Sequence, residues 1–165
     1  MATLLELEAQ GALDRLDPGL MPGEQEFRRI YALPSFKTWL LEDLTRLGST
    51  WQREISPNEQ VFALFAQFCA GEPLTRGTHL SNLVHHGDGI WYLKTPDIRI
   101  FGWFYQKDYF IGSGGDCAEK IKHYNLYHGF ANQAVLHRNR LNLNEPKFVP
   151  GDNPNDVVSA FNFAL

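Results

Sequence analysis

Long hydrophobic runs are missing from this chain, and no window approaches the roughly 18 consecutive apolar residues that a membrane-spanning helix requires. A secretory signal is missing as well, because residues 1–23 lack a positively charged start followed by an apolar stretch. Acidic side chains stand there instead, at Glu6, Glu8, Asp14 and Asp17. We therefore expect a cytoplasmic protein that makes no contact with a membrane.

Cysteine is scarce, with only Cys69 and Cys117 in the whole sequence. The two lie far apart in unlike contexts and lack the CxxC spacing, which argues against a disulfide framework and against a cysteine-based zinc site. We expect both to be small core residues. The chain has 165 residues, of which 44% are hydrophobic. This is enough to bury one sizeable core, so we expect one domain.

A strong excess of positive charge is also lacking, since the formal net charge is −4. This value argues against a protein that coats nucleic acid over its whole surface. The charge is unevenly spread, because residues 1–60 hold 6 Lys and Arg against 10 Asp and Glu, whereas residues 94–140 hold 7 against 4. An acidic half thus precedes a locally basic one, although ordinary variation along a protein surface explains the difference equally well.

The first half of the chain predicts one strand and two helices. Residues 26–33 alternate loosely enough for a strand, and Pro34 then opens a helix with apolar positions at a 3.6-residue period. A second helix is predicted to begin at Ser56. Pro57 occupies its first position and Glu59, three residues after the cap, completes a capping box.

The second half predicts a meander of strands and one long helix. The strand-like segments are residues 79–86, 90–95, 97–106 and 108–114, with a turn at Lys107 and Asp108. A final helix is expected from about Cys117 to Asn139, weakened in the middle by Gly129.

Together these elements predict an α+β fold in which a two-helix hairpin packs on a small antiparallel sheet and leaves the opposite face open as a concave surface. A C-terminal helix and a tail follow. We divide the chain into an N-terminal arm over residues 1–23, the α+β domain over residues 24–141, and an extended tail over residues 142–165 that lies on the surface or on a partner.

The segment from Gly87 to Gly115, GDGIWYLKTPDIRIFGWFYQKDYFIGSGG, resembles part of the RelE/ParE superfamily of bacterial toxins, in particular its HigB-like, often phage-derived branch. The shared pattern is a glycine-led turn, two strands of which the second carries an arginine and aromatics, and a short strand that ends in glycine. Lysines and a helix follow in both. Where the family commonly has Glu-Leu-Arg, this chain has Tyr92, Leu93 and Lys94.

The resemblance implies a RelE-like fold and metal-independent cleavage of messenger RNA, often on the ribosome, by a toxin that a cognate antitoxin holds inactive. Attack by a 2′-hydroxyl needs a base, a cation that stabilises the phosphorane, and an acid for the leaving oxygen. Lys94 and Arg99 lie on adjacent predicted strands, where together they would form a phosphate clamp. The alternative is that both are ordinary solvated sheet residues.

Proton transfer is assigned to histidines and a tyrosine. His86, with His85 beside it, precedes the glycine-rich turn, where HigB-like members can supply a catalytic histidine. Tyr124 and His128 are four residues apart and could share a site on one helix, whereas His123 could not easily join them. RNA contacts are expected from His85, Lys120, Lys122 and Tyr127. The competing interpretation places the tyrosines in the core and leaves the histidines exposed.

Other chemistries fit the residues less well. A metal site could draw on His85, His86 and Asp88, but adjacent histidines on a strand point to opposite faces and no HExxH motif is present. We expect no metal and no cofactor. Nucleophilic catalysis at Ser113 or Cys117 lacks the GxSxG elbow and an evident neighbouring base.

The rival to the toxin is a non-enzymatic binding or regulatory module on the same scaffold. It would use the aromatic strand residues as interface anchors, unless these are core. The residues concerned are Trp91, Phe101, Trp103, Tyr105 and Tyr109.

Overall fold

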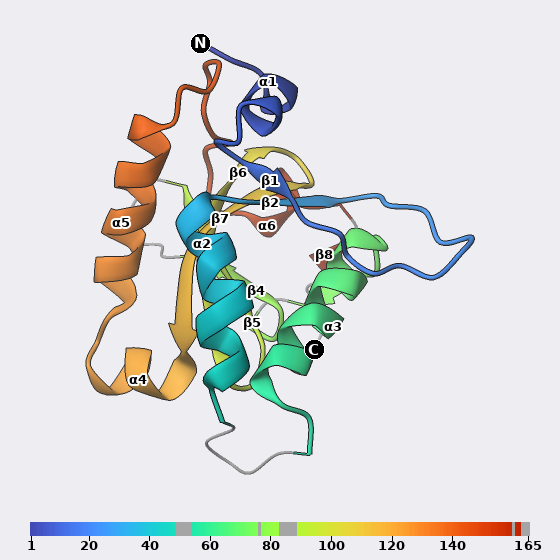
Figure 1. Ribbon diagram of the computed structural model, residues 1–165, viewed down its shortest axis with the longest axis vertical. Coiled ribbons are helices and arrows are strands. Elements are labelled where there is room, and N and C mark those ends of the chain that lie inside the picture. The colour runs from blue at the N-terminus through green and yellow to red at the C-terminus, as the bar shows by residue number, and fades with distance from the viewer. Residues whose placement is uncertain (49–53, 76, 83–88, 160, 163–165) are drawn as a thin grey trace.

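The computed structural model describes residues 1–165 except 49–53, 76, 83–88, 160 and 163–165. Its centre is a six-stranded sheet with the order β1-β2-β7-β6-β5-β4 (Figure 1). The strands are β1 (Asp14–Arg15), β2 (Arg29–Ala32), β4 (Leu80–Asn82), β5 (Ile90–Lys94), β6 (Ile98–Gln106) and β7 (Tyr109–Cys117). A separate pair joins β3 (Leu74–Thr75) to β8 (Phe161–Asn162) in parallel.

Helices pack on both faces of the sheet, which gives the α+β class that the pattern predicted. They are α1 (Leu4–Ala9), α2 (Pro34–Thr38), α3 (Pro57–Cys69), α4 (Ala118–His123), α5 (Tyr127–Arg140) and α6 (Pro154–Val157). A π-helical turn η1 (Trp39–Asp43) and a 3-10 turn η2 (Leu44–Arg46) continue α2. The start of α3 is as predicted, because Ser56 accepts a hydrogen bond from the Glu59 backbone N–H and Pro57 is the first helical residue. The Glu59 carboxylate accepts the Ser56 hydroxyl (3.0 Å) and not the Ser56 backbone N–H, so the predicted capping box forms only in part.

The predicted meander is confirmed, since β5, β6 and β7 are consecutive antiparallel neighbours. Asp108 completes the turn between β6 and β7 with a positive φ of 70°. A register shift between Phe101 and Gly102 lets β6 approach β7 so closely that a Cβ on Gly102 would lie 2.1 Å from the Ile111 carbonyl oxygen. Only glycine fits at that position.

The expectation of an antiparallel sheet is wrong in one respect, because β2 pairs with β7 in parallel. The N-terminal segment supplies β2 and also β1, which runs antiparallel to β2 at the edge. The sheet is therefore mixed. Local patterning predicts that a strand exists but not which neighbour it joins.

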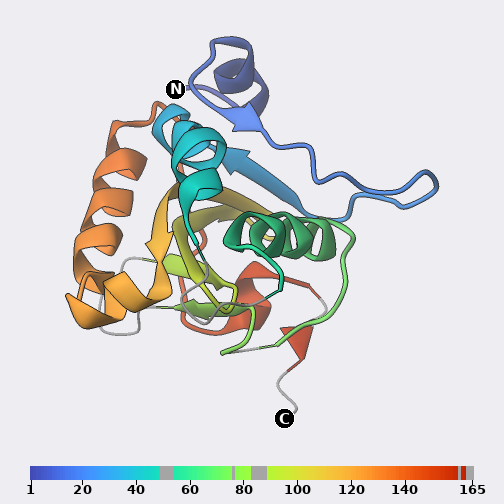
Figure 2. The same cartoon turned by 60° about the horizontal axis from the view of Figure 1, so that its bottom comes forward.

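One face of the sheet carries the helical hairpin that was predicted. The segment α2, η1 and η2 and the helix α3 cover it, and Phe36, Leu44 and Phe65 are buried there against Trp91 and Phe104. Figure 2 shows α3 lying across the sheet, with the continuation of α2 beside it. Phe36 takes the room of a side chain at Gly112, where an added Cβ would lie 2.3 Å from its ring.

The opposite face is not the open concave surface that we expected. Helix α5 packs against β5, β6 and β7, and a second core forms there. Two small residues of α5, Ala131 and Ala134, are fully buried in this core beside Trp103 and Ile111. Because alanine side chains are short, the helix can approach the sheet closely and cover its face.

The expected single helix over residues 117–139 is instead two helices. Asn125 adopts a positive φ of 52° between α4 and α5, a conformation that asparagine tolerates better than most residues. Gly129, which we expected to weaken the helix, lies inside α5. This break changes which side chains can share a helix face.

Both terminal segments contribute to the cores. In residues 1–23, Thr3 and Glu6 form a capping box for α1, and Leu7 and Leu13 are buried. In residues 142–165, Val157 and Val158 are fully buried in the core below α3, so the tail is not simply an extended surface segment. A β-bridge between Ala2 and Leu143 brings the two segments together.

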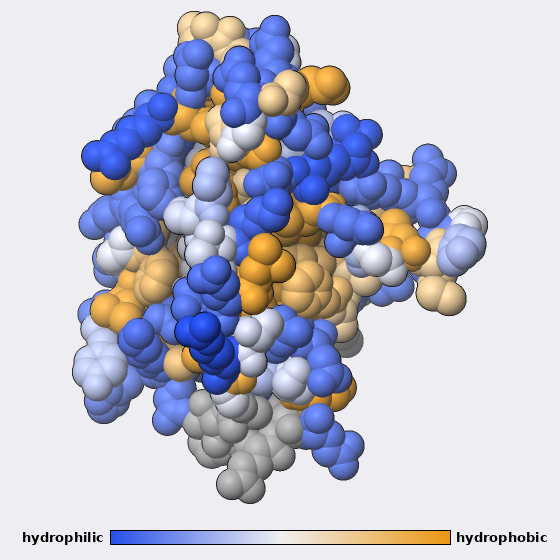
Figure 3. Space-filling view, in the orientation of Figure 1, coloured by the Kyte–Doolittle hydropathy of each residue, from blue (hydrophilic) through white to orange (hydrophobic). Residues whose placement is uncertain are grey.

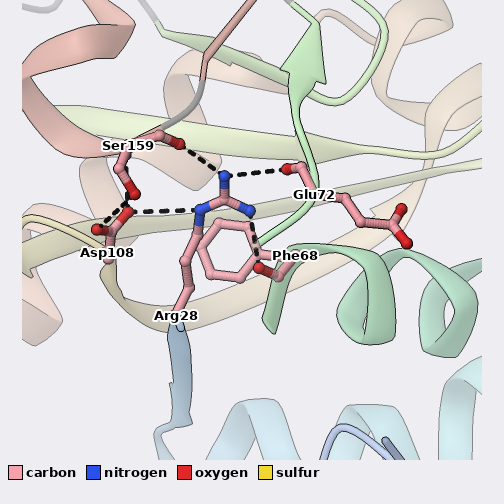
Figure 4. A network of polar contacts seen from close by, with 5 residues as sticks. All are labelled: Arg28, Phe68, Glu72, Asp108 and Ser159. Carbon is pink, nitrogen blue, oxygen red and sulfur yellow. Dashed lines mark hydrogen bonds and ion pairs between the residues drawn. The ribbon is translucent and has the colours of Figure 1, made fainter. Parts of the chain in front are cut away.

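A buried arginine holds the C-terminal segment in place (Figure 4). Arg28 donates hydrogen bonds to the carbonyl oxygens of Phe68 (2.8 Å), Glu72 (3.0 Å) and Ser159 (2.6 Å). Its Nε lies 3.4 Å from Oδ1 of Asp108, and that carboxylate also accepts hydrogen bonds from the backbone N–H and the hydroxyl of Ser159. Arg28 thereby links the end of α3, the turn after β6 and the C-terminal segment.

Candidate functional site

Lys94, Arg99 and Asp116 form one row across three strands at the same end of the sheet. Lys94 of β5 is the register partner of Arg99 of β6, and Arg99 is the partner of Asp116 of β7. Directly opposed residues of antiparallel strands project from the same face. Since Leu93 and Ile98 face the core below α3, the row lies on the other face, together with α5.

Arg99 is buried, with 4% of its surface exposed. Its Nη1 donates to the carbonyl oxygens of Thr95 (2.7 Å) and Ile98 (3.0 Å), which directs the guanidinium toward the turn between β5 and β6. Its Nε finds no hydrogen-bond partner in the part of the chain that the structure describes. Within the described ranges no carboxylate forms an ion pair with Arg99. Among the described residues, the groups that contact the charged end of this arginine are therefore carbonyl dipoles.

Lys94 is half-buried, and its Nζ donates to the carbonyl oxygen of Gly77 (2.6 Å). Burial lowers the pKa of Lys94, and the positive charges of Arg99 and Lys122 lower it further. The charges of Arg99 and Lys122 thus both act on Lys94, which ends β5. Like charges gathered in this way favour an anion between them.

Asp116 does not neutralise this group. Its Oδ2 lies 3.0 Å from Nζ of Lys120 one helical turn onward, and its Oδ1 accepts the backbone N–H of Cys117 (2.8 Å). Lys120, which we expected to contact RNA, is accordingly an ion-pair partner of Asp116, and this carboxylate raises its pKa. The two carboxylate oxygens of Asp116 are therefore paired with Lys120 and with the backbone of Cys117.

Aromatic side chains continue the same face beside the cations. The ring centroid of Tyr92 lies 5.4 Å from that of Tyr127 and 5.5 Å from that of Phe101, and Phe101 stacks on Phe130 at 5.0 Å. Tyr92 and Tyr127 are half-buried, so their rings are partly open to solvent. Burial raises the pKa of Tyr92 above its ordinary value.

The expected pairing of Tyr124 with His128 is wrong in its geometric basis. Tyr124 follows the end of α4, whereas His128 lies in α5, so the two no longer share one helix face. Tyr124 is 65% exposed and packs edge-on against His123, at 4.6 Å between ring centroids. His128 is exposed as well. His85 and His86 lie outside the described residues.

Two histidines that the sequence did not point to make defined contacts. Nδ1 of His79 accepts the backbone N–H of Thr75 (3.0 Å), and burial lowers the pKa of this imidazole. Nδ1 of His137 lies 2.7 Å from the hydroxyl oxygen of Ser113, 24 residues earlier in the chain. A short sequence motif cannot join residues that only strand and helix packing brings together.

Other kinds of site find little support within the described residues. No group of three or more histidine, cysteine, aspartate or glutamate side chains is placed to hold a metal ion there. No helix in the same ranges is long and apolar enough to cross a membrane. Comparison of the chain with protein-family models, curated proteins and solved structures finds no match in any of the three. A role for Lys94 and Arg99 therefore rests on their geometry in this structure.

Proposed function

We propose that this protein binds single-stranded RNA and cleaves it without a metal ion, as a cytoplasmic RelE-like toxin of the HigB kind that a cognate antitoxin restrains. One observation carries the proposal, namely that Lys94 and Arg99 stand side by side on one face with Lys122 acting on the same space. The negative charge of a phosphodiester balances the positive charge of these side chains.

Single-stranded RNA suits this site better than a duplex. Tyr92 and Tyr127 present partly open rings next to the cations. Aromatic side chains bind splayed bases by stacking, which a base-paired helix does not permit. The net charge of −4 for the whole chain restricts attraction to this local region. Messenger RNA, free or on the ribosome, is the substrate that follows from the resemblance.

The proposed cleavage transfers the phosphate within the RNA. The 2′-oxygen attacks phosphorus and loses its proton to a base, the bond from phosphorus to the 5′-oxygen breaks, and the departing oxygen takes up a proton. The products are a 2′,3′-cyclic phosphate and a 5′-hydroxyl. Arg99 and Lys94 stabilise the charge of the phosphorane, and His86 is the proposed base. His128 or Tyr124 supplies the proton.

The first experiment separates the site from general charge. Binding of a short single-stranded RNA is measured by fluorescence anisotropy for the wild type and for Lys94→Ala, Arg99→Ala and Lys107→Ala. Lys107 is an exposed lysine in the turn after β6 and serves as the matched control. We expect Kd to rise at least about tenfold for the first two variants, which equals about 1.4 kcal/mol, and to change less than twofold for the control. Equal affinities for all four proteins would contradict the proposal.

The second experiment tests cleavage in cells. Induction of the wild type should arrest growth and cut messenger RNA, whereas Lys94→Ala, Arg99→Ala and His86→Ala should relieve both effects. Circular dichroism spectra that match the wild type exclude unfolding as the cause. A neighbouring gene that encodes a small helix-turn-helix protein and restores growth would identify the antitoxin. If expression of all four proteins were harmless, the toxin hypothesis would be excluded and the binding module would remain.

A binding module is the second candidate, and a specific surface favours it. Trp91, Phe101 and Trp103 are at most 1% exposed, so they are core and not interface anchors. A pocket along α5 is instead lined by Leu126, Gly129, Phe130, Asn132, Gln133 and Leu136. The space-filling view shows apolar side chains between hydrophilic ridges over α5 and α2 (Figure 3). Partner binding that Leu136→Asp abolishes and Lys94→Ala leaves intact would support this candidate.

A further inference from the structure

A pocket of about 370 Å³ lies between the beginning of α2 and the end of α5. Ala12, Leu33, Pro34 and Leu141 form its apolar wall, and the remaining lining residues are Ser35, His137 and Arg140. The pocket is remote from Lys94 and Arg99. Tyr127 begins α5 and Arg140 ends it, a separation of about 20 Å at about 1.5 Å of rise per residue.

His137 is held in a fixed orientation at this pocket. Its Nδ1 lies 2.7 Å from the hydroxyl oxygen of Ser113, which is 3% exposed. Ser113 is the extra residue of β7 where the pairing with β6 shifts register. The bulge turns the hydroxyl toward α5, so Nδ1 is committed to the sheet. Nε2 is then the ring nitrogen that remains to meet a ligand.

Arg140 provides the positive charge of the pocket. It is exposed, and within the described part of the chain its guanidinium makes no hydrogen bond or ion pair. Burial lowers the pKa of His137, and the charge of Arg140 lowers it further. His137 contacts the Ser113 hydroxyl of β7, and Ser35 lines the pocket from the start of α2. Among the lining residues, Arg140 is the one charged side chain.

We propose that this pocket binds a small monocarboxylate with an apolar body. Its carboxylate would contact the guanidinium of Arg140 and Nε2–H of His137, and its body would lie on Leu33, Pro34 and Leu141. The proposal uses the tautomer in which Nδ1 accepts the Ser113 hydroxyl at 2.7 Å and Nε2 carries the proton. A planar carboxylate matches the fork of a guanidinium.

The chemistry of the walls selects this class of ligand. The guanidinium of Arg140 alone balances a single negative charge, whereas a dianionic phosphate would also require the imidazolium form of His137, which burial and Arg140 disfavour. Most of the lining is apolar, so a ligand that consisted of a carboxylate alone would make no contact with the apolar wall. A neutral molecule of the same size would leave Arg140 unpaired.

Binding of a carboxylate also changes the protonation of His137. An anion next to the ring favours the imidazolium, which opposes the effects of burial and of Arg140. The complex therefore takes up protons when it forms near pH 6.5, the ordinary pKa of histidine. Proton uptake is a readout that general adhesion of an apolar ligand does not produce.

Hexanoate is the probe for the test. Hexanol, which has the apolar body without the carboxylate, and acetate, which has the carboxylate with almost no apolar body, are the controls. Calorimetry at pH 6.5 in two buffers of different ionisation enthalpy measures both Kd and proton uptake, and NMR of the His137 ring locates the ligand. We expect hexanoate to bind at least tenfold more tightly than hexanol or acetate, with proton uptake and a shift of the His137 signals.

Variants of the full chain complete the test. Arg140→Gln should weaken hexanoate binding at least tenfold, and His137→Gln should abolish proton uptake while weak binding persists. Arg46→Gln removes the same charge at an exposed site of η2 and should change neither. No shift at His137, equal binding of hexanol, or an equal loss in Arg46→Gln would overturn the proposal. The RNA-binding proposal is unaffected by any of these results.

Discussion

Arg28 and Arg99 are both buried arginines, with 0% and 4% of their surfaces exposed, but their surroundings differ. Arg28 donates to three backbone carbonyl oxygens, lies 3.4 Å from the Asp108 carboxylate and sits over the Phe68 ring at 5.3 Å. Arg99 donates to two carbonyl oxygens and has Lys94 as its cross-strand neighbour. Arg28 thus has a carboxylate beside it, whereas Arg99 adds to a group of cations, and the Nε of each is buried without a hydrogen bond in the described part of the chain.

The difference separates a structural role from a binding role. A buried charge is tolerated when partners compensate it, and Arg28 finds its compensation in residues from three distant segments. Arg99 has carbonyl dipoles but no counterion within the described residues. The missing negative charge can come from a ligand. The resemblance pointed to Arg99, whereas no feature of the sequence marked Arg28.

The largest expected effect is on stability. Arg28→Met removes the charge and leaves four acceptor groups without their donor, so the free energy of unfolding should fall by about 3–5 kcal/mol. Arg15→Met is the control, because Arg15 forms an exposed ion pair with Glu26 at 2.6 Å and should cost less than about 1 kcal/mol. Urea denaturation measures both. Similar small losses would mean that Arg28 does not hold the C-terminal segment.

Thiol labelling shows where Arg28→Met loosens the protein. Burial raises the pKa of Cys69 to about 12, so a disulfide reagent should modify Cys117 and leave Cys69 intact in the native wild type. In Arg28→Met, labelling of Cys69 should accelerate by more than about 100-fold, the factor that about 3 kcal/mol corresponds to. Arg99→Met should accelerate it by no more than about 5–30-fold, the factor that a loss of about 1–2 kcal/mol corresponds to, and rapid labelling of Cys69 in the wild type would refute its burial.

Arg99→Met should show the opposite balance of effects. Two hydrogen bonds to carbonyl oxygens are lost, while the repulsion of Lys94 is relieved, so we expect a loss of about 1–2 kcal/mol of stability. RNA affinity should fall at least about tenfold, with a smaller dependence of Kd on salt concentration. Folded Arg28→Met should retain wild-type affinity. If both variants lost affinity equally, the distinction between the two arginines would fail.

The smallest effect is a dependence of stability on alkaline pH. Burial, Arg99 and Lys122 lower the folded-state pKa of Lys94 below the ordinary 10.5. Between the two values the unfolded chain binds more protons than the folded one, so the free energy of unfolding should rise with pH and level off near 10.5. Denaturation curves from pH 8 to 10.5 should show this rise in the wild type and a smaller one in Lys94→Gln. A fall in its place would contradict the sign.

Local patterns predicted much of the secondary structure. The cap at Ser56, the start of α2 at Pro34 and the meander from β5 to β7 each depend on residues close in sequence. The helix break at Asn125 was missed, because apolar spacing continues across it and nothing local requires a positive φ there. The covering of the second face was missed for a related reason, since the helical period does not say which surface a helix packs on.

The candidate site was predictable in part. Lys94 and Arg99 share a face because a short turn pairs β5 with β6 in one register, and this follows from strand spacing. Their surroundings did not follow from it. The pairing of Lys120 with Asp116, and the contact of Ser113 with His137, depend on how α4 and α5 dock on β7.

The sequence alone therefore determined the α+β class, the order of the central strands along the chain and the pair of cations at their turn, because each of these depends on neighbours a few residues away. Tertiary structure decided which face α5 covers, that β2 joins β7 in parallel, and which of two buried arginines lies beside a carboxylate. Those outcomes depend on contacts between segments as distant as Arg28 and Ser159, and packing, not local periodicity, selects among them.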